Sequence, residues 1–164
     1  MSVLRLAAMA LALLVSTQAM AQGTNVTLGG INADPTAPVE VTAESLSVDQ
    51  ENGTAVFSGN VTIGQGDVRI SATEVRVVYG ESTGQIARLV ATGGVTFVTA
   101  TEAAEAENAD YDIENGQLVL TGNVLLTQGA SALAAERMVV DLTNGTARMD
   151  GRVRTVFQQQ NGGN

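Results

Sequence analysis

The chain has 164 residues, of which 45% are hydrophobic and 3% aromatic, and its formal net charge at pH 7 is −9. It contains no Cys, no His and no Lys, so every basic residue is Arg. The absence of His removes the commonest general base, the Ser-His nucleophile pair and the usual nitrogen ligand of zinc. The negative charge argues against a nucleic-acid partner. We therefore expect a protein that is not an enzyme and has no catalytic residues, metal ligands or cofactor.

Residues 1–21 have the composition of a secretory signal peptide. Arg5 precedes an apolar stretch from Leu6 to Val15, and Ala19-Met20-Ala21 forms an Ala-x-Ala cleavage site. The apolar stretch is too short for a membrane span, so we expect cleavage after Ala21, and a retained anchor helix is the alternative. A flexible lead-in at 22–37, one domain at 38–157 and a disordered polar tail at 158–164 are expected to follow.

An internal repeat of about 29 residues fills the expected domain, in four copies. In three copies an Ala lies 16 residues before a Gly: Ala43 and Gly59, Ala106 and Gly122, Ala135 and Gly151. The second copy, from Ala72 to Gly93, carries an insertion. Asn-Gly pairs between these marks predict hairpins with type I′ turns, because both central residues of that turn need positive φ. The Gly of each Gly-x-Val step predicts a bulge or bend where the strand crosses between sheets.

Apolar residues alternate with polar ones through every copy, and this period of two predicts strands with one buried and one solvated face. We expect an all-β fold, a sandwich or jelly roll of roughly a dozen or more short strands. In the third copy the alternation places Thr99, Thr101 and Ala103 in the inward column. The stretch from Thr101 to Asn108 has a helix-like composition, and we interpret it as a strand or an exposed edge.

Six acidic residues gather in the third copy: Glu102, Glu105, Glu107, Asp110, Asp112 and Glu114. Paired carboxylates could serve a glycosidase, and clustered ones a calcium site. The spacing has no calcium-loop character and places the cluster on the outer face of a strand. We therefore interpret it as a solvated face.

Four stretches of the chain point to a family: Pro-Val-Glu-Val-Thr-Ala-Glu-Ser-Leu-Ser-Val-Asp at 38–49, Ala-Glu-Asn-Ala-Asp-Tyr-Asp at 106–112, Leu-Thr-Gly-Asn-Val at 120–124 and Ala-Glu-Arg-Met-Val-Val-Asp at 135–141. Together they resemble the LptA/OstA-like family of periplasmic lipopolysaccharide-transport proteins. The resemblance implies a twisted antiparallel β jelly roll in the periplasm, with an apolar trough that shields lipopolysaccharide acyl chains between the two membranes. By position, the family's lipid-contacting sites fall on Val39, Val41, Phe97, Tyr111 and Ile113.

The inward apolar residues of all copies together form the candidate trough. They are Val39, Val41, Leu46, Val48, Phe57, Val61, Ile63, Val75, Val77, Val95, Phe97, Tyr111, Ile113, Leu118, Leu120, Val124, Leu126, Met138 and Val140. The implied partners are lipid A acyl chains, jelly-roll domains of inner- and outer-membrane transport proteins, and further copies of this chain joined head to tail. Val39 to Ala43 and Arg152 to Phe157 are the candidate edge strands.

Other interpretations of the same residues remain open at this point. The inward residues could form an ordinary dry core. The chain could be a jelly-roll partner in a head-to-tail bridge of such domains that stays tethered to the inner membrane. It could also be a structural or adhesive β protein that assembles by strand edges, or a secreted hydrolase.

Overall fold

The computed structural model describes residues 24–27, 36–80 and 84–157, and within them every regular element is a β-strand. In that part of the chain we find no helix with the length and hydropathy of a membrane span. The strands are β1 (Thr24–Thr27), β2 (Glu40–Thr42), β3 (Ser45–Asp49), β4 (Thr54–Gln65), β5 (Val68–Tyr79), β6 (Ile86–Val98), β7 (Glu102–Asp112), β8 (Gln117–Gln128), β9 (Ser131–Asp141), β10 (Thr146–Asp150) and β11 (Arg154–Phe157).

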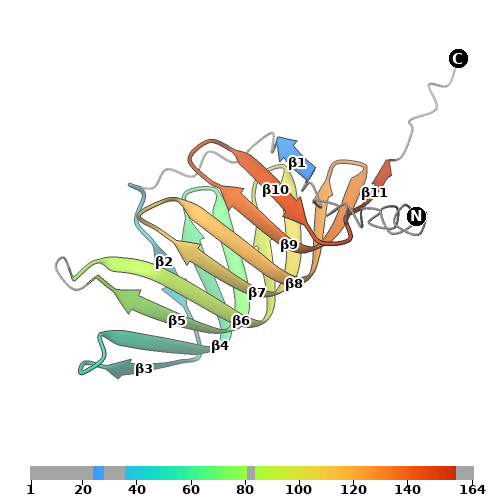
Figure 1. Cartoon of the computed structure of the whole chain (residues 1–164). Helices are drawn as coiled ribbons and strands as arrows, with labels where there is room; N and C mark the ends of the chain where they lie inside the picture. Colours follow the sequence, from blue (N-terminus) through green and yellow to red (C-terminus); the bar gives the residue numbers. More distant parts are fainter. Residues whose placement is uncertain (1–23, 28–35, 81–83, 158–164) are drawn as a thin grey trace, which may run out of the picture.

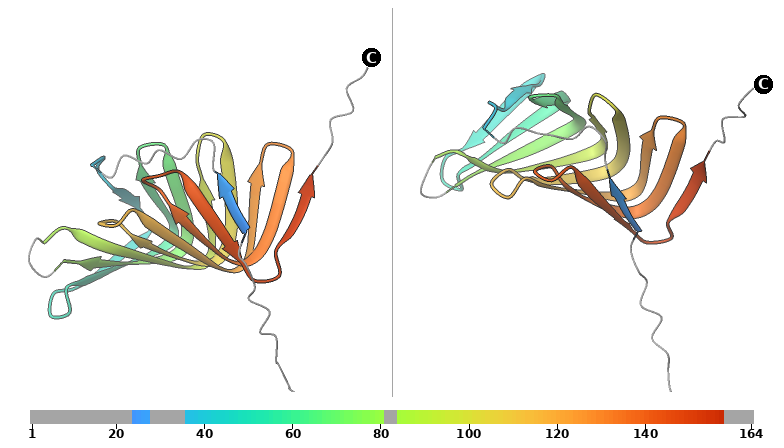
Figure 2. Two further views of the ribbon diagram at one scale, coloured as in Figure 1. Left: turned by 45° about the horizontal axis from the view of Figure 1, so that its top comes forward. Right: turned by 90° about the horizontal axis from the view of Figure 1, so that it is seen from above.

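All of these strands belong to one antiparallel sheet. Its order is β1-β10-β9-β8-β7-β6-β5-β4-β2, with β3 also paired to β4 and β11 also paired to β9. The views show the bent strands side by side, from β4 to β9 and β11 (Figure 1, Figure 2). The predicted all-β antiparallel class is confirmed, and the fold is consistent with a jelly roll. The prediction of short strands was wrong for β4 to β9, which have 11 to 13 residues each.

Each long strand passes through a bulge at mid-length, and the bulges align into one line across the sheet, which we call the fold line. In β8 the register against β9 shifts between Thr121 and Val124, and the register against β7 shifts between Thr121 and Leu125. Gly122 and Asn123 between them have φ of 82° and 47°, the left-handed region that L side chains avoid. Because pairing resumes beyond the bulge, the strand bends without ending. The predicted bend at Gly-x-Val is confirmed.

The fold line divides the sheet into two half-sheets. The β2–β11 half-sheet contains β2, residues 61–65, 68–72, 95–98, 102–106, 124–128 and 131–135, and β11. The β3–β10 half-sheet contains β3, residues 54–58, 74–79, 86–92, 108–112, 117–121 and 137–141, β10 and β1. Buried apolar side chains of both half-sheets form a single cluster, so the half-sheets face each other across a shared interior.

The Asn-Gly hairpins differ from the prediction. Gly53, Gly116 and Gly145 have positive φ, but the Asn residues before them do not, so these are not type I′ turns. Four residues separate the paired strands, as at 113–116 between β7 and β8. An Asp at the end of the first strand accepts hydrogen bonds from the turn: Asp112 Oδ1 from the Asn115 amide at 3.0 Å, and Oδ2 from Asn115 Nδ2 at 2.8 Å. In the second copy six residues, 80–85, separate β5 from β6, and the paired segments on either side, 74–79 and 86–92, are also longer than in the other copies.

Among the described residues both candidate edges lie at ends of the sheet, where β2 pairs with β4 and β11 pairs with β9. The expected flexible lead-in contains a strand, because β1 pairs with β10 from Thr24 opposite Met149 to Thr27 opposite Thr146. Residues 101–108 belong mostly to β7, a strand as predicted but one in the middle of the sheet rather than at an edge. The predicted signal peptide and polar tail lie outside the described residues.

Candidate functional site

The structure brings nearly all of the predicted trough residues to the interior. Those with at most 4% exposed surface are Val61, Ile63, Val75, Val77, Val95, Phe97, Tyr111, Leu118, Leu120, Val124, Leu126, Met138 and Val140. Val39, Val41, Phe57 and Ile113 are half-buried and pack against this cluster. The interior is therefore one continuous apolar layer that draws on both half-sheets.

The side chains of the two half-sheets pack against each other in the middle of the interior. Phe97, Leu118 and Leu126 have no exposed surface at all. The gap expected from the sequence is thus closed there in this structure. A hydrocarbon chain can enter only if the half-sheets separate or side chains give way, because interiors packed at protein density have no spare room for it.

At the β3 end the interior is uncovered. Leu46 lies opposite Phe57, and Val48 opposite Ala55, so both share the inward face. Their exposed fractions are nevertheless 54% and 59%. These two residues were predicted as trough lining, and the structure places them on the inward face without a covering half-sheet. The apolar interior therefore continues to an open end at β3.

The inward column of the third copy differs from the prediction by one residue. Glu102, Ala104 and Ala106 are buried, whereas Thr101 and Ala103 are not, and buried Thr99 precedes the strand. The bulge between Glu105 and Asn108 then carries the inward pattern on to Ala109 and Tyr111. The Ala106-Glu107 pair matches Ala43-Glu44, and aligning the third copy on this pair would have predicted correctly which of its residues face inward.

Glu102 was predicted to lie on a solvated outer face, and that prediction was wrong. Its side chain has 3% exposure. The carboxylate accepts hydrogen bonds from Thr99 Oγ1 at 2.6 Å, Thr101 Oγ1 at 2.5 Å and Gln128 Nε2 at 3.1 Å. These donors replace water around a buried charge, which would otherwise be very costly. Glu105 and Glu107 are exposed, as predicted.

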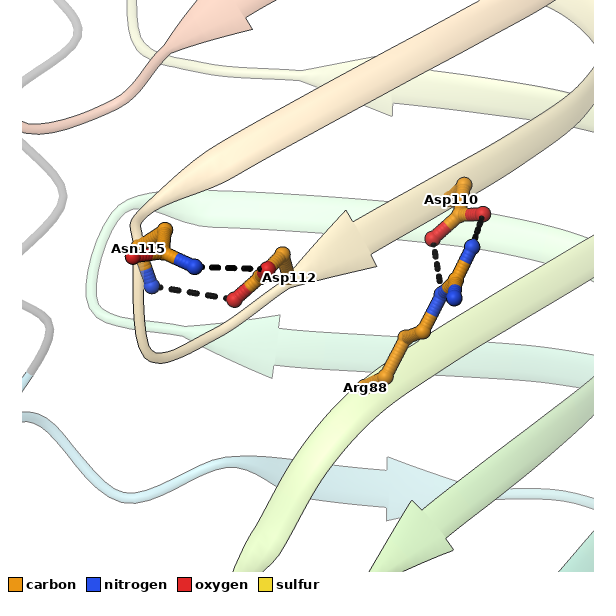
Figure 3. A network of polar contacts seen from close by, with 4 residues as sticks. All are labelled: Arg88, Asp110, Asp112 and Asn115. Carbon is orange, nitrogen blue, oxygen red and sulfur yellow. Dashed lines mark hydrogen bonds and ion pairs between the residues drawn. The ribbon is translucent and has the colours of Figure 1, made fainter.

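Two outer carboxylates of β7, those of Asp110 and Asp112, are held in structural contacts (Figure 3). Arg88 on β6 donates to both oxygens of Asp110, with Nε 2.6 Å from Oδ1. The hydrogen bonds from Asn115 hold the pKa of Asp112 below its ordinary value. Among the residues that the structure describes, no three His, Cys, Asp or Glu side chains gather as metal ligands. Asp110 and Asp112 thus stabilise the pairing of β6 with β7 and the β7–β8 hairpin.

Known proteins share this architecture. The family model described as LptA/(LptD N-terminal domain) LPS transport protein matches residues 40–146. The chain belongs to this family. The resemblance inferred from the sequence is thereby confirmed.

Individual relatives are more distant. LptH of Pseudomonas aeruginosa, whose crystal structure is described as that of the LptA homologous periplasmic component of the lipopolysaccharide transport device, matches with a TM-score of 0.70 at 18% identity. The match covers 77% of this chain and 99% of that chain, and at this identity it establishes likeness of fold. An uncharacterized protein of Rhizobium meliloti (strain 1021) is 26% identical over 73 residues, 44% of this chain. The match spans 39% of that relative's length.

Proposed function

We propose that the protein is a non-enzymatic periplasmic carrier of lipopolysaccharide whose interior takes up the lipid's acyl chains between the inner and outer membranes. The observation that carries the proposal is the single cluster of buried apolar side chains that both half-sheets share, with uncovered inward side chains at β3. Family membership supports transport of lipopolysaccharide as the task. The predicted signal peptide at residues 1–21 supports export.

The chemistry of the interior fits a lipid that must be held and then released. Burial of one methylene contributes about 0.8 kcal/mol, so ten methylenes give about 8 kcal/mol, near a micromolar dissociation constant before costs. One such cost is the loss of contacts between Phe97, Leu118 and their neighbours when the half-sheets part. Self-packing therefore lowers the net affinity and favours release to the next carrier.

The two ends of the sheet favour head-to-tail assembly. One end presents the strands β2 and β3 with the uncovered Leu46 and Val48, and the other presents β11. Acidic Glu40 and Glu44 lie at the first end and basic Arg154 at the second, where Arg152 is paired with Glu136. A neighbour's strand added at such an edge satisfies unpaired backbone groups, and a contact between different surfaces builds an open chain. The neighbour would be a second copy or a related jelly-roll domain.

Depletion of the protein from its own cells tests the transport function. Newly made lipopolysaccharide, followed by a pulse label, should accumulate at the inner membrane and fail to reach the cell surface. Re-expression of the full chain should restore delivery. Undiminished surface arrival in depleted cells would contradict the proposal and favour a structural or adhesive role.

The assembly step has its own test in solution. Leu46→Asp and Val48→Asp place a charge on the uncovered inward face, whereas Ser47→Asp places the same charge on the exposed outward face of β3. Light scattering over a concentration series should show weakened self-association for the first two variants and no change for the third. Equal self-association of all three would show that this end is not the interface.

A further inference from the structure

One hydrogen bond crosses the interior far from the fold line. The Tyr111 hydroxyl donates to Gln65 Oε1 at 2.7 Å, and the two residues are 46 positions apart in sequence. Gln65 is the last residue of β4 in the β2–β11 half-sheet, and Tyr111 is the residue before the end of β7 in the β3–β10 half-sheet. Both therefore lie at the rims of their half-sheets, where the half-sheets could open.

Both side chains are buried, each with 3% exposed surface. Gln65 is also fixed from its other side, because its Nε2 donates to the Ala37 carbonyl at 3.1 Å. Burial raises the pKa of the Tyr111 hydroxyl and the nearby Asp112 charge adds to this, so the hydroxyl keeps its proton and remains a donor. A hydrogen bond in such a dry place is directional, unlike the apolar contacts around it.

We propose that the Tyr111–Gln65 hydrogen bond is a latch that holds the half-sheets together at their rims, and that hydrocarbon enters the interior where this latch opens. The second part rests on the proposed function. Parting of the rims breaks the bond and exposes the packed side chains behind it. A net hydrogen bond of ordinary strength shifts such an opening equilibrium by about two- to tenfold.

A thiol reporter measures this opening directly. The chain has no Cys, so one introduced Cys is a unique label site. Ala104→Cys places the thiol inward on the β2–β11 half-sheet, at a residue with 1% exposure, and Ala106→Cys places it beside the fold line. When opening is brief, the labelling rate follows the population of the open state.

The latch is removed by Tyr111→Phe, which keeps the ring, and the matched control is Tyr79→Phe, since Tyr79 is exposed at the end of β5. Tyr111→Phe should speed labelling of Ala104→Cys about two- to tenfold and change labelling of Ala106→Cys much less. Gln65→Met should act alike, and the double variant should be no faster than the faster single one. Unchanged labelling, equal acceleration at both reporters, or equal acceleration by Tyr79→Phe would overturn the latch.

Lipopolysaccharide supplies the second readout. Its association with the full chain, followed by stopped flow with a fluorescent derivative, should be faster for Tyr111→Phe by the same factor as the thiol labelling. If labelling responds while neither protein binds the lipid, the latch stands and the proposed function fails. If Tyr111→Phe speeds thiol labelling but leaves the rate of lipid association unchanged, the lipid does not enter at the rims.

Discussion

Asn123 donates a 2.6 Å hydrogen bond from Nδ2 to Oε1 of Glu107, which lies 16 residues earlier on the neighbouring strand. Asn60 donates likewise to Glu44, and Arg152 Nε donates to Glu136 at 2.8 Å, again over 16 residues. Each pair lies at the fold line, next to a Gly of positive φ. The constant spacing in the sequence thus records a bend contact that recurs along the sheet.

The fold line can be tested with adjacent glycines of β6. Gly93 and Gly94 have φ of 84° and 85°, but an added Cβ at Gly93 would lie 2.7 Å from Thr73 Cβ, whereas one at Gly94 has open space around it. Gly94→Ala should lower the free energy of unfolding by about 1 to 2 kcal/mol through the left-handed backbone alone. Gly93→Ala should cost more, because Thr73 must also move. Urea unfolding measures both, and equal losses would contradict the contact.

Glu102 and Glu105 lie on the same strand, but Glu102 is buried and Glu105 is exposed. Their substitutions can therefore be compared directly. Glu102→Ala removes the carboxylate that accepts hydrogen bonds from Thr99, Thr101 and Gln128, and we expect a loss of about 1 to 3 kcal/mol in the free energy of unfolding. Glu105→Ala should change it by less than about 0.5 kcal/mol. If thermal and urea unfolding gave the two variants the same stability, the buried position of Glu102 would be refuted.

Because of the aspartates at the hairpins, we expect the free energy of unfolding to fall in acid. Hydrogen bonds from the turn hold the pKa of Asp49, Asp112 and Asp141 below the ordinary 3.8. A carboxyl with a lowered folded pKa stabilises the fold above its unfolded value, and this stabilisation disappears as the pH falls through the folded value. The difference in stability between the wild type and Asp112→Asn should therefore be present at neutral pH and shrink below about pH 4.

Urea midpoints of the wild type and Asp112→Asn between about pH 6 and about pH 3 measure this difference. A stability difference between the wild type and Asp112→Asn that grows as the pH falls would contradict the lowered pKa of Asp112. The contacts are exposed, so the effect per turn is expected to be small.

The alternation of apolar and polar residues and the Gly-x-Val steps were enough to predict the strands, their inward faces and the bend. Three features could not be obtained in this way. The phase of β7 depends on a two-residue bulge, so Glu102 was assigned to the wrong face. The Asp-based hairpins depend on a side chain three residues before the Asn-Gly step. The closed interior depends on how Phe97, Leu118 and Leu126 pack across the half-sheets, which no single strand records.

The central claim is that acyl chains occupy the interior, and site-specific photocrosslinking in cells tests it most directly. A photoreactive phenylalanine derivative replaces Phe97, which is fully buried, or the adjacent Thr96, which faces outward and is exposed. The two residues are neighbours on β6, so their side chains point to opposite faces of the sheet at nearly the same position. With each variant shown to be folded, irradiation should attach lipopolysaccharide at position 97 and not at position 96. Equal attachment at both positions, or none at 97, would contradict the account.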